Sequence, residues 1–408
     1  MHSDHRPRHQ PPMKPPLILF GAFDRHNLGD LLFPHIVAAL LPERQPVFAG
    51  LMQRDLRRFG GHRVQAIADI ARNWGDQPAD LIHVGGELLD CDLYQATVML
   101  QTPANAAASI ARYDTDPAAG LHWAQQQTGL PQQCGYLADK RWFRQPRHFI
   151  YNGIGGAGLT TLPVSCRAEV LQRLSQAEHI GVREQQTLAT LAAAGIASEL
   201  QPDCAALLPQ LFRPAAVTCG RQGEVANVRK ACPNGYLAIQ FASELADDQT
   251  LATIAAQLGP AARQHRLALV FFRAGAAPWH DELQPYRRVA AHLAGIAVHL
   301  FESLNIWDIV ALLAHARCYC GTSLHGRIVA NGFGIPAVSL AGSGAAVKVA
   351  ANLQMLQPAD GSELIQPGDL AAAIERAMAS PASGLAAAAT QAATACRRGC
   401  ERWLQLLR

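Results

Sequence analysis

Short apolar runs alternate with longer amphipathic stretches along most of this chain of 408 residues. Runs of strand length lie at 16–23, 80–90, 147–158 and within 177–196, and each is followed by a turn or directly by helical periodicity. The first run, PLILFGAF, leads through the loop DRHNLGD into the helical stretch LLFPHIVAALL, which Asp30 can cap. Strands that alternate with helices in this way predict a parallel sheet with helices on both faces.

The alternation stops at residues 209–234 and then starts again. That segment loses its periodicity and gains proline, glycine and charge, which is typical of a boundary between domains. Beyond it, strand patterns such as GYLAIQFA (235–242) and RLALVFFRAG (266–275) alternate with helical ones. The stretch NIWDIVALLAHA begins at an asparagine cap, Asn305, and its apolar residues recur at the i, i+3, i+4 and i+7 positions of a helix. We therefore expect a second parallel sheet in this half.

The two halves together predict an α/β protein of two Rossmann-like, doubly wound domains that face a cleft. A chain of this length is too long for one ordinary core. We expect a disordered lead-in at 1–16, an N-terminal Rossmann-like domain at 17–210, a linker at 211–234, a C-terminal Rossmann-like domain at 235–367, and C-terminal helices at 368–408 that pack back across the molecule. Ligands of doubly wound sheets bind beyond the carboxyl ends of the strands. The loops at those ends are where a site is expected.

Composition favours a packed globular protein and gives no reason to expect a nucleic-acid partner. Hydrophobic residues make up 49% of the chain, charged residues 16%, and the net charge is only +3. No apolar run approaches the roughly 20 residues of a membrane span, although the basic, proline-rich lead-in is compatible with peripheral membrane association. The ten cysteines include no CxxC pair, so buried thiols in a reducing cytoplasm are expected rather than disulfides or a metal site.

The stretch GTSLHGRI places polar residues where a predicted strand is followed by a helix. Ser323 or Thr322 can cap this helix, and the free amides of its first turn form a site for an anion. His325 can exchange a proton near neutral pH, and Arg327 can bind a carboxylate or phosphate if it faces the cleft. A capped helix with a solvated histidine and arginine explains the same pattern equally well.

Charged residues also follow other predicted strands. Arg183, in GVREQQTL, either forms a surface ion pair with Glu184 or reaches into the cleft to bind an anion. Arg273 follows the apolar run ALVFF at the edge of the sheet where ligands bind, and His280 and Asp281 lie in the loop beyond it. The glycines of NGIGGAG lack the GxGxxG spacing, which favours a tight turn over a nucleotide site.

The order of several motifs resembles the polysaccharide pyruvyl transferase family. The stretches that carry the resemblance are GAFDRHNLGD, HVGGELLDCD, IYNGIGGAG, GVREQQTLATLAAAGI, LQPDCAALL, the block NIWDIVALLAHARCYCGTSLHGRIVANGFGIPAVSL and VKVAANLQML, over about residues 17–357. The resemblance implies a fold similar to the GT-B glycosyltransferases. It also implies transfer of a pyruvyl group from phosphoenolpyruvate to two hydroxyls of a sugar, which forms a ketal on a surface polysaccharide such as an exopolysaccharide.

The resemblance also implies roles for individual residues. In family members with an S-x-R-L-H block, the arginine and the histidine lie at the donor site; here His325 matches the histidine, and Ser323 occupies the arginine position. The family's central arginine matches Arg183, which is therefore expected to bind an anion. His325 is the candidate acid for protonating the methylene carbon of phosphoenolpyruvate.

Phosphoenolpyruvate carries a carboxylate and a phosphate, so its site is expected to contain several cationic donors beside the helix start. The predicted donor-binding residues are Arg183, Arg273, Ser323, Arg327 and Lys348. The predicted acceptor-side residues, among which a general base is sought, are Asn27, Asp30, Glu87 and Asp281. This chemistry requires neither a metal nor another cofactor, and the acceptor is expected to be a glycan or a lipid- or nucleotide-linked sugar.

Two other functions fit the same two-domain cleft. One is a GT-B glycosyltransferase with a nucleotide-sugar donor, because a helix start binds a diphosphate as well as a single phosphate. The other is a binding protein of the same fold without turnover. The reason to consider it is Ser323, which occupies the position of the family's arginine.

Overall fold

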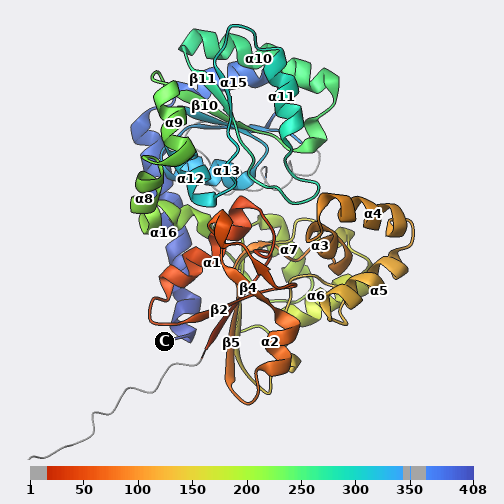
Figure 1. The fold of residues 1–408 in the computed structure, drawn as a ribbon. Coiled ribbons are helices and arrows are strands. Elements are labelled where there is room, and N and C mark those ends of the chain that lie inside the picture. Colours follow the sequence, from red (N-terminus) through yellow and green to blue (C-terminus); the bar gives the residue numbers. More distant parts are fainter. Residues whose placement is uncertain (1–15, 343–349, 351–363) are drawn as a thin grey trace, which may run out of the picture.

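Each of the two lobes of the protein is built on a largely parallel sheet (Figure 1). The computed structural model describes residues 16–342, 350 and 364–408, so the predicted lead-in lies outside the described residues except for Pro16. The predicted α/β class, with two doubly wound units, is confirmed.

The N-terminal sheet has nine strands in the order β3-β4-β2-β1-β5-β7-β8-β9, with β6 paired to β7. Neighbouring strands run parallel except β3 and β4. The strands are β1 (Leu17–Phe20), β2 (Pro46–Gly50), β3 (Arg54–Asp55), β4 (Arg63–Ala66), β5 (Pro78–His83), β6 (Gly86–Glu87), β7 (Gln145–Gly155), β8 (His179–Val182) and β9 (Glu199–Leu200). The helices of this lobe are α1 (Leu28–Leu40), α2 (Ile67–Asn73), α3 (Leu93–Met99), α4 (Pro103–Tyr113), α5 (Pro117–Thr128), α6 (Val164–Leu174) and α7 (Gln185–Ala193). The strand order reverses between β1 and β5, which is where such sheets bind ligands.

The C-terminal sheet has six parallel strands in the order β12-β11-β10-β13-β14-β15. They are β10 (Tyr236–Gln240), β11 (Ala268–Phe271), β12 (Val298–Leu300), β13 (Cys318–Gly321), β14 (Ala337–Leu340) and β15 (Leu364–Ile365). Its helices are α10 (Asp248–His265), α11 (Leu283–Ala291), α12 (Ile306–Ala314), α13 (Leu324–Gly332) and α15 (Leu370–Met378). Here the order reverses between β10 and β13, so the loops after these two strands are the second place where a ligand is expected.

Two helices occupy the segment that was expected to be a linker. They are α8 (Leu208–Cys219) and α9 (Gly223–Ala231). The helical period is obscured in the sequence because α8 is kinked: Phe212 has non-helical backbone angles, and Pro214 lies inside the helix without an N–H to donate.

Helix α1 begins earlier than the apolar pattern indicates. Asn27 caps it in place of Asp30, because Asn27 Oδ1 accepts from the amides of Gly29 at 3.1 Å and Asp30 at 3.4 Å. Pro34 lies inside the helix. The earlier start brings the first turn of α1 to the carboxyl edge of the sheet.

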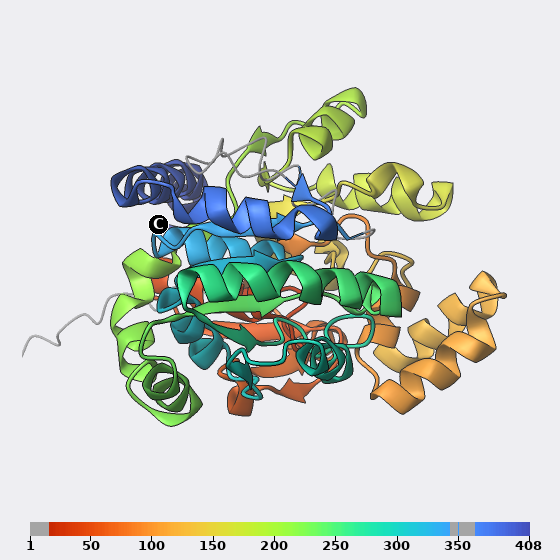
Figure 2. The same ribbon diagram turned by 90° about the horizontal axis from the view of Figure 1, so that it is seen from above.

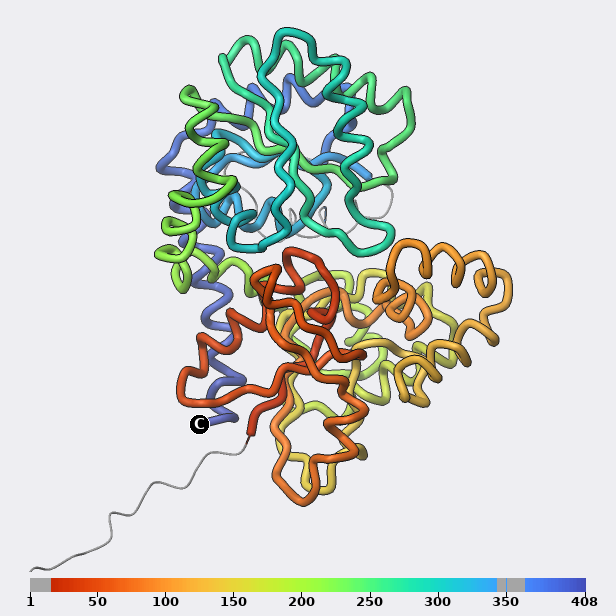
Figure 3. Tube along the Cα trace, viewed as in Figure 1, coloured from red at the N-terminus to blue at the C-terminus, as the bar shows by residue number. Residues whose placement is uncertain are grey.

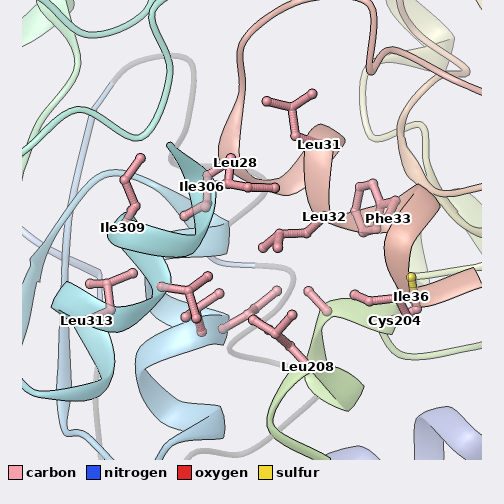
Figure 4. Packing of buried hydrophobic residues seen from close by; sticks show 14 of the residues in the cluster. Leu28, Leu31, Leu32, Phe33, Ile36, Cys204, Leu208, Ile306, Ile309 and Leu313 are labelled. Atoms are coloured by element: carbon pink, nitrogen blue, oxygen red, sulfur yellow. The ribbon is translucent and has the colours of Figure 1, made fainter. Parts of the chain in front are cut away.

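One hydrophobic core joins the two lobes. It includes Leu28 and Leu32 of α1 and Ile306 and Ile309 of α12, and Figure 4 shows Leu28 beside Ile306. Backbone contacts add to it, because the amide of Leu28 donates to the carbonyl of Ala274 at 2.7 Å. Burial of this apolar surface holds the lobes together.

The C-terminal helices connect the lobes a second time. Helix α15 packs against α10 of the C-terminal lobe, and Figure 2 shows the two side by side. Helix α16 (Ala382–Leu406) then runs to the N-terminal lobe, beside which the chain ends (Figure 3). There Trp403 Nε1 donates to Asn152 Oδ1 at 3.0 Å. None of the helices in the described ranges has the length and apolar character needed to cross a membrane.

Candidate active site

A cleft of about 340 Å³ lies between the lobes, at the carboxyl ends of both sheets. The loop after β1 supplies Arg25 and Asn27, and the loop after β10 supplies Ala242. The start of α13 and the loop after β11 complete much of the wall. Because the strand order of each sheet reverses at β1 and β10, the cleft occupies the position where doubly wound sheets bind ligands.

Most of the residues predicted for a site lie in the wall of this cleft. They are Asn27, Asp30, Glu87, Arg183, Asp281, Ser323 and His325. They come from segments far apart in the sequence, which explains why no single motif contains the site.

His325 lies in the first turn of α13 and pairs with a buried carboxylate. Its Nε2 is 3.3 Å from Oδ2 of Asp203, whose Oδ1 accepts from the amide of Ala205 at 3.0 Å. Burial would raise the pKa of Asp203, but His325 and Arg183 outweigh burial and hold it at about 2. Asp203 therefore stays ionised, orients the imidazole and stabilises positive charge on it. The sequence did not single out Asp203 as a site residue.

Helix α1 packs against the His325 ring from the other side. The ring meets that of Phe33 edge-on, with 5.2 Å between centroids. A β-carbon built on Gly29 would lie 2.1 Å from Nδ1, 2.2 Å from Cγ and 2.3 Å from Cε1 of His325, so the backbone of Gly29 lies against the face of the ring. The NLGD motif thus has a physical meaning. Asn27 caps α1, and Gly29 leaves the space that His325 fills.

We predict that Gly29→Ala lowers turnover by at least about 100-fold, because the new methyl group displaces the His325 ring from Asp203. Helix propensity alone would favour alanine by about 1 kcal/mol. A loss of turnover would therefore result from the clash between the new methyl group and the His325 ring. Gly368→Ala is the matched control, since a β-carbon there meets nothing within 4 Å. Steady-state rates of both variants, with melting temperatures, check the prediction. Equal rates for Gly29→Ala and the unmodified protein would contradict it.

Arg183 lines the cleft but is bound to three carboxylates. Its Nη2 lies 2.6 Å from Glu87 Oε2, its Nη1 lies 2.9 Å from Asp203 Oδ2, and its Nε lies 3.4 Å from Glu184 Oε1. Burial opposes the charge of the guanidinium, but Glu87, Asp203 and Glu184 outweigh burial and raise its pKa. A guanidinium already outnumbered by carboxylates is a poor clamp for another anion. The geometry gives Arg183 a positioning role instead: it holds Asp203 beside His325.

Arg25 is a cation in the cleft wall that the sequence analysis missed. Its side chain is 11% exposed, and its Nη2 is 3.4 Å from Asp30 Oδ2. Its Nε and Nη1 are buried and have no hydrogen-bond partner among the described residues. Because both nitrogens lie below the protein surface, the Arg25 side chain must turn into the cleft to offer them to an anionic ligand. The signal in the sequence was the position of Arg25 between a buried strand and the Asn27 cap, at the carboxyl edge of the sheet.

The first turn of α13 offers backbone donors to the cleft. Of the two caps expected, Ser323 is used: its Oγ accepts from the amide of Gly326 at 3.1 Å. Its own amide donates to Gln240 Oε1 at 2.8 Å. The amides of Leu324 and His325 have no partner within the helix, so they and the helix dipole favour an anion here.

Asp281 is tied to the start of α13 through Gln240. Its Oδ1 accepts from Gln240 Nε2 at 2.8 Å, and its Oδ2 accepts from the amides of Ala274 at 2.6 Å and Gly275 at 3.2 Å. Burial raises the pKa of Asp281 from its ordinary 3.8 to about 7, although these donors limit the rise. A carboxyl group with such a pKa exchanges protons near neutral pH.

Two arginines predicted to bind the donor lie outside the cleft wall. Arg327 is 1% exposed and donates to Ala337 O at 3.1 Å and Ser339 Oγ at 3.0 Å. The prediction for Arg327 is wrong, because two helical residues turn the side chain by about 200° away from the His325 direction. Arg273 points toward the carbonyl of Glu302, 3.4 Å from its Nη2. Lys348, like most of the stretch VKVAANLQML, lies outside the described residues.

Carboxylates outnumber cations in the part of the cleft wall that the structure describes. The cations are Arg25 and Arg183, and the carboxyl groups are Asp30, Glu87, Glu244 and Asp281. The predicted concentration of cations is therefore absent from this part of the wall. Carboxylates accept hydrogen bonds from hydroxyls, so the wall combines an anion-binding corner with a surface suited to a polyhydroxylated ligand.

Comparison with known proteins gives one family and one fold. A family model described as polysaccharide pyruvyl transferase matches residues 27–344, a region that begins just after Arg25. Among curated proteins, no relative matches the chain.

Among solved structures, the similar ones include UDP-N-acetylglucosamine 2-epimerases. The enzyme from Rickettsia bellii is 8% identical, with a TM-score of 0.57 and 97% of each chain covered. A putative one from Listeria monocytogenes is 13% identical, with a TM-score of 0.51, covering 96% of this chain and 95% of that chain. The enzyme from Methanocaldococcus jannaschii is 10% identical, with a TM-score of 0.50, covering 90% of this chain and 93% of that chain. At such identities the likeness shows the fold alone, which is GT-B-like.

Proposed function

The chain belongs to the polysaccharide pyruvyl transferase family, and from this premise we propose that it transfers the pyruvyl group of phosphoenolpyruvate to two hydroxyls of a sugar. The product is a cyclic ketal on a glycan or on its lipid- or nucleotide-linked precursor. The observation that carries the proposal is the His325–Asp203 pair, which shares a cleft with an arginine whose donors are unused.

The donor needs cationic groups for its carboxylate and its phosphate. Arg25 supplies Nε and Nη1 to one of these groups. The amides of Leu324 and His325, with the dipole of α13, bind the other. This assignment replaces Arg183, Arg273 and Arg327 of the sequence-based hypothesis.

The enol carbon of the donor becomes reactive only after its methylene carbon is protonated. His325 donates that proton from Nδ1, because Asp203 engages Nε2. A sugar hydroxyl then attacks the central carbon and loses its proton. The bond to the phosphate oxygen breaks, phosphate leaves, and a second hydroxyl of the same sugar closes the ketal with loss of its own proton. One of the two released protons restores His325, and the other leaves with hydrogen phosphate.

Asp281 is the base that this scheme requires for the hydroxyls. It lies in the wall of the same cleft, and its pKa of about 7 lets it accept a proton and release it again near neutral pH. Gln240 connects it to the helix start where the donor binds.

Replacement of Asp281 by asparagine should lower kcat by about 100-fold. In the unmodified protein, kcat should rise with pH through about 7 as Asp281 ionises, and the variant should lack this limb. Both effects are checked by measuring kcat of the two proteins between about pH 5 and pH 9, a range that extends to either side of the Asp281 pKa. If kcat of Asp281→Asn shows the same rise with pH, Asp281 is not the base.

The same group makes stability depend on pH with a defined sign. Asp281 binds its proton more tightly in the folded protein, with a pKa of about 7, than at its ordinary pKa of 3.8. Its contribution to the free energy of unfolding is therefore full below about pH 4 and is lost as pH rises through about 7. Urea unfolding of the protein and of Asp281→Asn should show this difference, which confirms that the carboxyl group is buried independently of any activity.

A donor screen tests the proposed function against its alternatives. Phosphoenolpyruvate at about 100 times its Kd should raise the melting temperature, because such saturation stabilises by about 2.7 kcal/mol. UDP-glucose and UDP-N-acetylglucosamine are the comparison compounds. Stabilisation by a nucleotide sugar alone would instead identify a glycosyltransferase. Stabilisation by phosphoenolpyruvate without phosphate release, across a panel of glycans, would identify a binding protein.

A further inference from the structure

Trp279 is an exposed aromatic residue in the wall of the cleft. It lies in the loop between β11 and α11, and the residue is 51% exposed. The other large hydrophobic residues exposed in the described ranges are aliphatic and lie outside this wall: Val164, Leu200, Val217 and Leu406. An indole left open to solvent at a ligand cleft offers a flat apolar surface that the fold itself does not bury.

The backbone of Trp279 is held in a conformation that tryptophan rarely adopts. Its φ is 66°, and in the described ranges the only other non-glycine residue with positive φ is Arg266, which ends α10. A bulky residue in this region is strained, and such strain persists only where the surroundings enforce it, typically at functional sites.

The surroundings of Trp279 do enforce it. Asp281 accepts from the amides of Ala274 and Gly275 at 2.6 and 3.2 Å, and its own amide donates to the carbonyl of Gly275 at 3.0 Å. The loop is also tied to the opposite lobe, because the amide of Ala276 donates to His26 Nδ1 at 3.1 Å. The loop is thus closed at its base and anchored at its side, which leaves Trp279 at its tip facing the cleft.

We propose that Trp279 is the platform on which a pyranose ring of the acceptor stacks, an inference that rests on the proposed function. A pyranose has a flat face of C–H groups that packs on an aromatic ring, and a rim of hydroxyls that hydrogen-bond to carboxylates. The same loop carries both partners: the indole of Trp279, and two residues later the carboxyl group of Asp281. A sugar held by the indole therefore presents its hydroxyls on the side of the loop that supplies the proposed base.

The anion-binding corner is separate from this platform. Arg25 belongs to the loop after β1, and the open amides belong to the start of α13. Loss of the indole should consequently weaken binding of the sugar and leave binding of the phosphate-bearing donor unchanged.

Sugar binding without donor is the direct test. Methyl glycosides of glucose, galactose, mannose and N-acetylglucosamine, and uridine diphosphate as a separate probe, are titrated by saturation-transfer NMR. The proteins compared are the unmodified chain, Trp279→Ala, Trp279→Gly, and Trp142→Ala, which changes a partly exposed tryptophan outside the cleft. We expect at least one glycoside to bind, with its Kd raised about 10-fold or more in both Trp279 variants and unchanged in Trp142→Ala.

Stability separates a platform from a packing residue. Glycine adopts positive φ without strain, so Trp279→Gly should melt at the same temperature as the unmodified protein or higher, while Kd for phosphoenolpyruvate stays the same. A clear fall in melting temperature with unchanged sugar affinity would overturn the proposal. Failure of the unmodified protein to bind any of the glycosides, or a loss of uridine diphosphate binding alone in the Trp279 variants, would overturn it as well.

The outcome for Trp279 can be told apart from that for the proposed function. If the glycoside binds through Trp279 but no phosphate is released from phosphoenolpyruvate, the platform stands and pyruvyl transfer fails. If phosphate is released and the KM for the acceptor is the same in Trp279→Ala, pyruvyl transfer stands and the platform fails.

Discussion

Replacing His325 with glutamine should lower the rate of phosphate release from phosphoenolpyruvate by about 100- to 10,000-fold, the usual contribution of a positioned acid. Glutamine keeps an N–H group for Asp203 Oδ2 but cannot carry the transferred proton. The donor should still bind, with a Kd within about threefold of the original, because its anionic groups contact Arg25 and backbone amides. A phosphate-release assay and calorimetric titration of phosphoenolpyruvate measure the two quantities separately.

Arg25→Gln is the matched variant, with the opposite expectation. It removes a charged donor from the proposed phosphate or carboxylate site, so the Kd of phosphoenolpyruvate should rise by about 10- to 100-fold. The rate at saturating donor should fall much less than in His325→Gln. Normal phosphate release by His325→Gln would discard the histidine as the acid, and an unchanged Kd in Arg25→Gln would discard the arginine as a donor contact.

Replacing Arg183 with alanine should destabilise the fold by about 3–5 kcal/mol, because three carboxylates would remain together without their cation. The side chains concerned are nearly buried: exposure is 4% for Arg183, 12% for Glu87 and 2% for Asp203. The loss in the free energy of unfolding should be smaller at pH 5 than at pH 8, since protonation relieves the repulsion among the carboxylates. Urea unfolding at the two pH values measures it.

Arg57→Ala is the control for Arg183→Ala. Arg57 pairs with Asp55 at the surface, with 68% and 50% of the side chains exposed, so its removal should leave the stability nearly unchanged. If Arg183→Ala proved as stable as Arg57→Ala and bound phosphoenolpyruvate at least about 10-fold more weakly, Arg183 would be the donor clamp that the family resemblance suggested.

Much of the fold could be predicted because strand and helix periods are clear in its central elements. The helix after Asn305 starts where its cap and its apolar face indicate, and β13 passes into α13 at the predicted serine cap. Helices α3 to α5 were not predicted. Of the eleven residues of α4, only Ala106 is buried, so this helix shows little of the apolar face from which a helix is recognised.

The site was harder to predict, because its key contacts join distant parts of the chain. The 27–30 and 323–325 segments were both noted, but nothing in either indicates that Gly29 lies against the ring of His325. The carboxylate partner of His325 is 122 residues away, at Asp203. Arg183 was predicted to be a site residue. Its role, however, depends on three carboxylates that only the fold brings together. Arg327, in contrast, could have been excluded from helix geometry alone.

The most direct test of the central claim is to run the reaction in deuterium oxide with phosphoenolpyruvate and a glycan acceptor, and to analyse the product by NMR. If His325 protonates the methylene carbon and two hydroxyls then attack the central carbon, the methyl group of the ketal should carry a single deuterium. The ketal should form in equal amount with phosphate, and it should be absent with His325→Gln. Phosphate released without a ketal, a methyl group free of deuterium, or the same product from His325→Gln would contradict the mechanism.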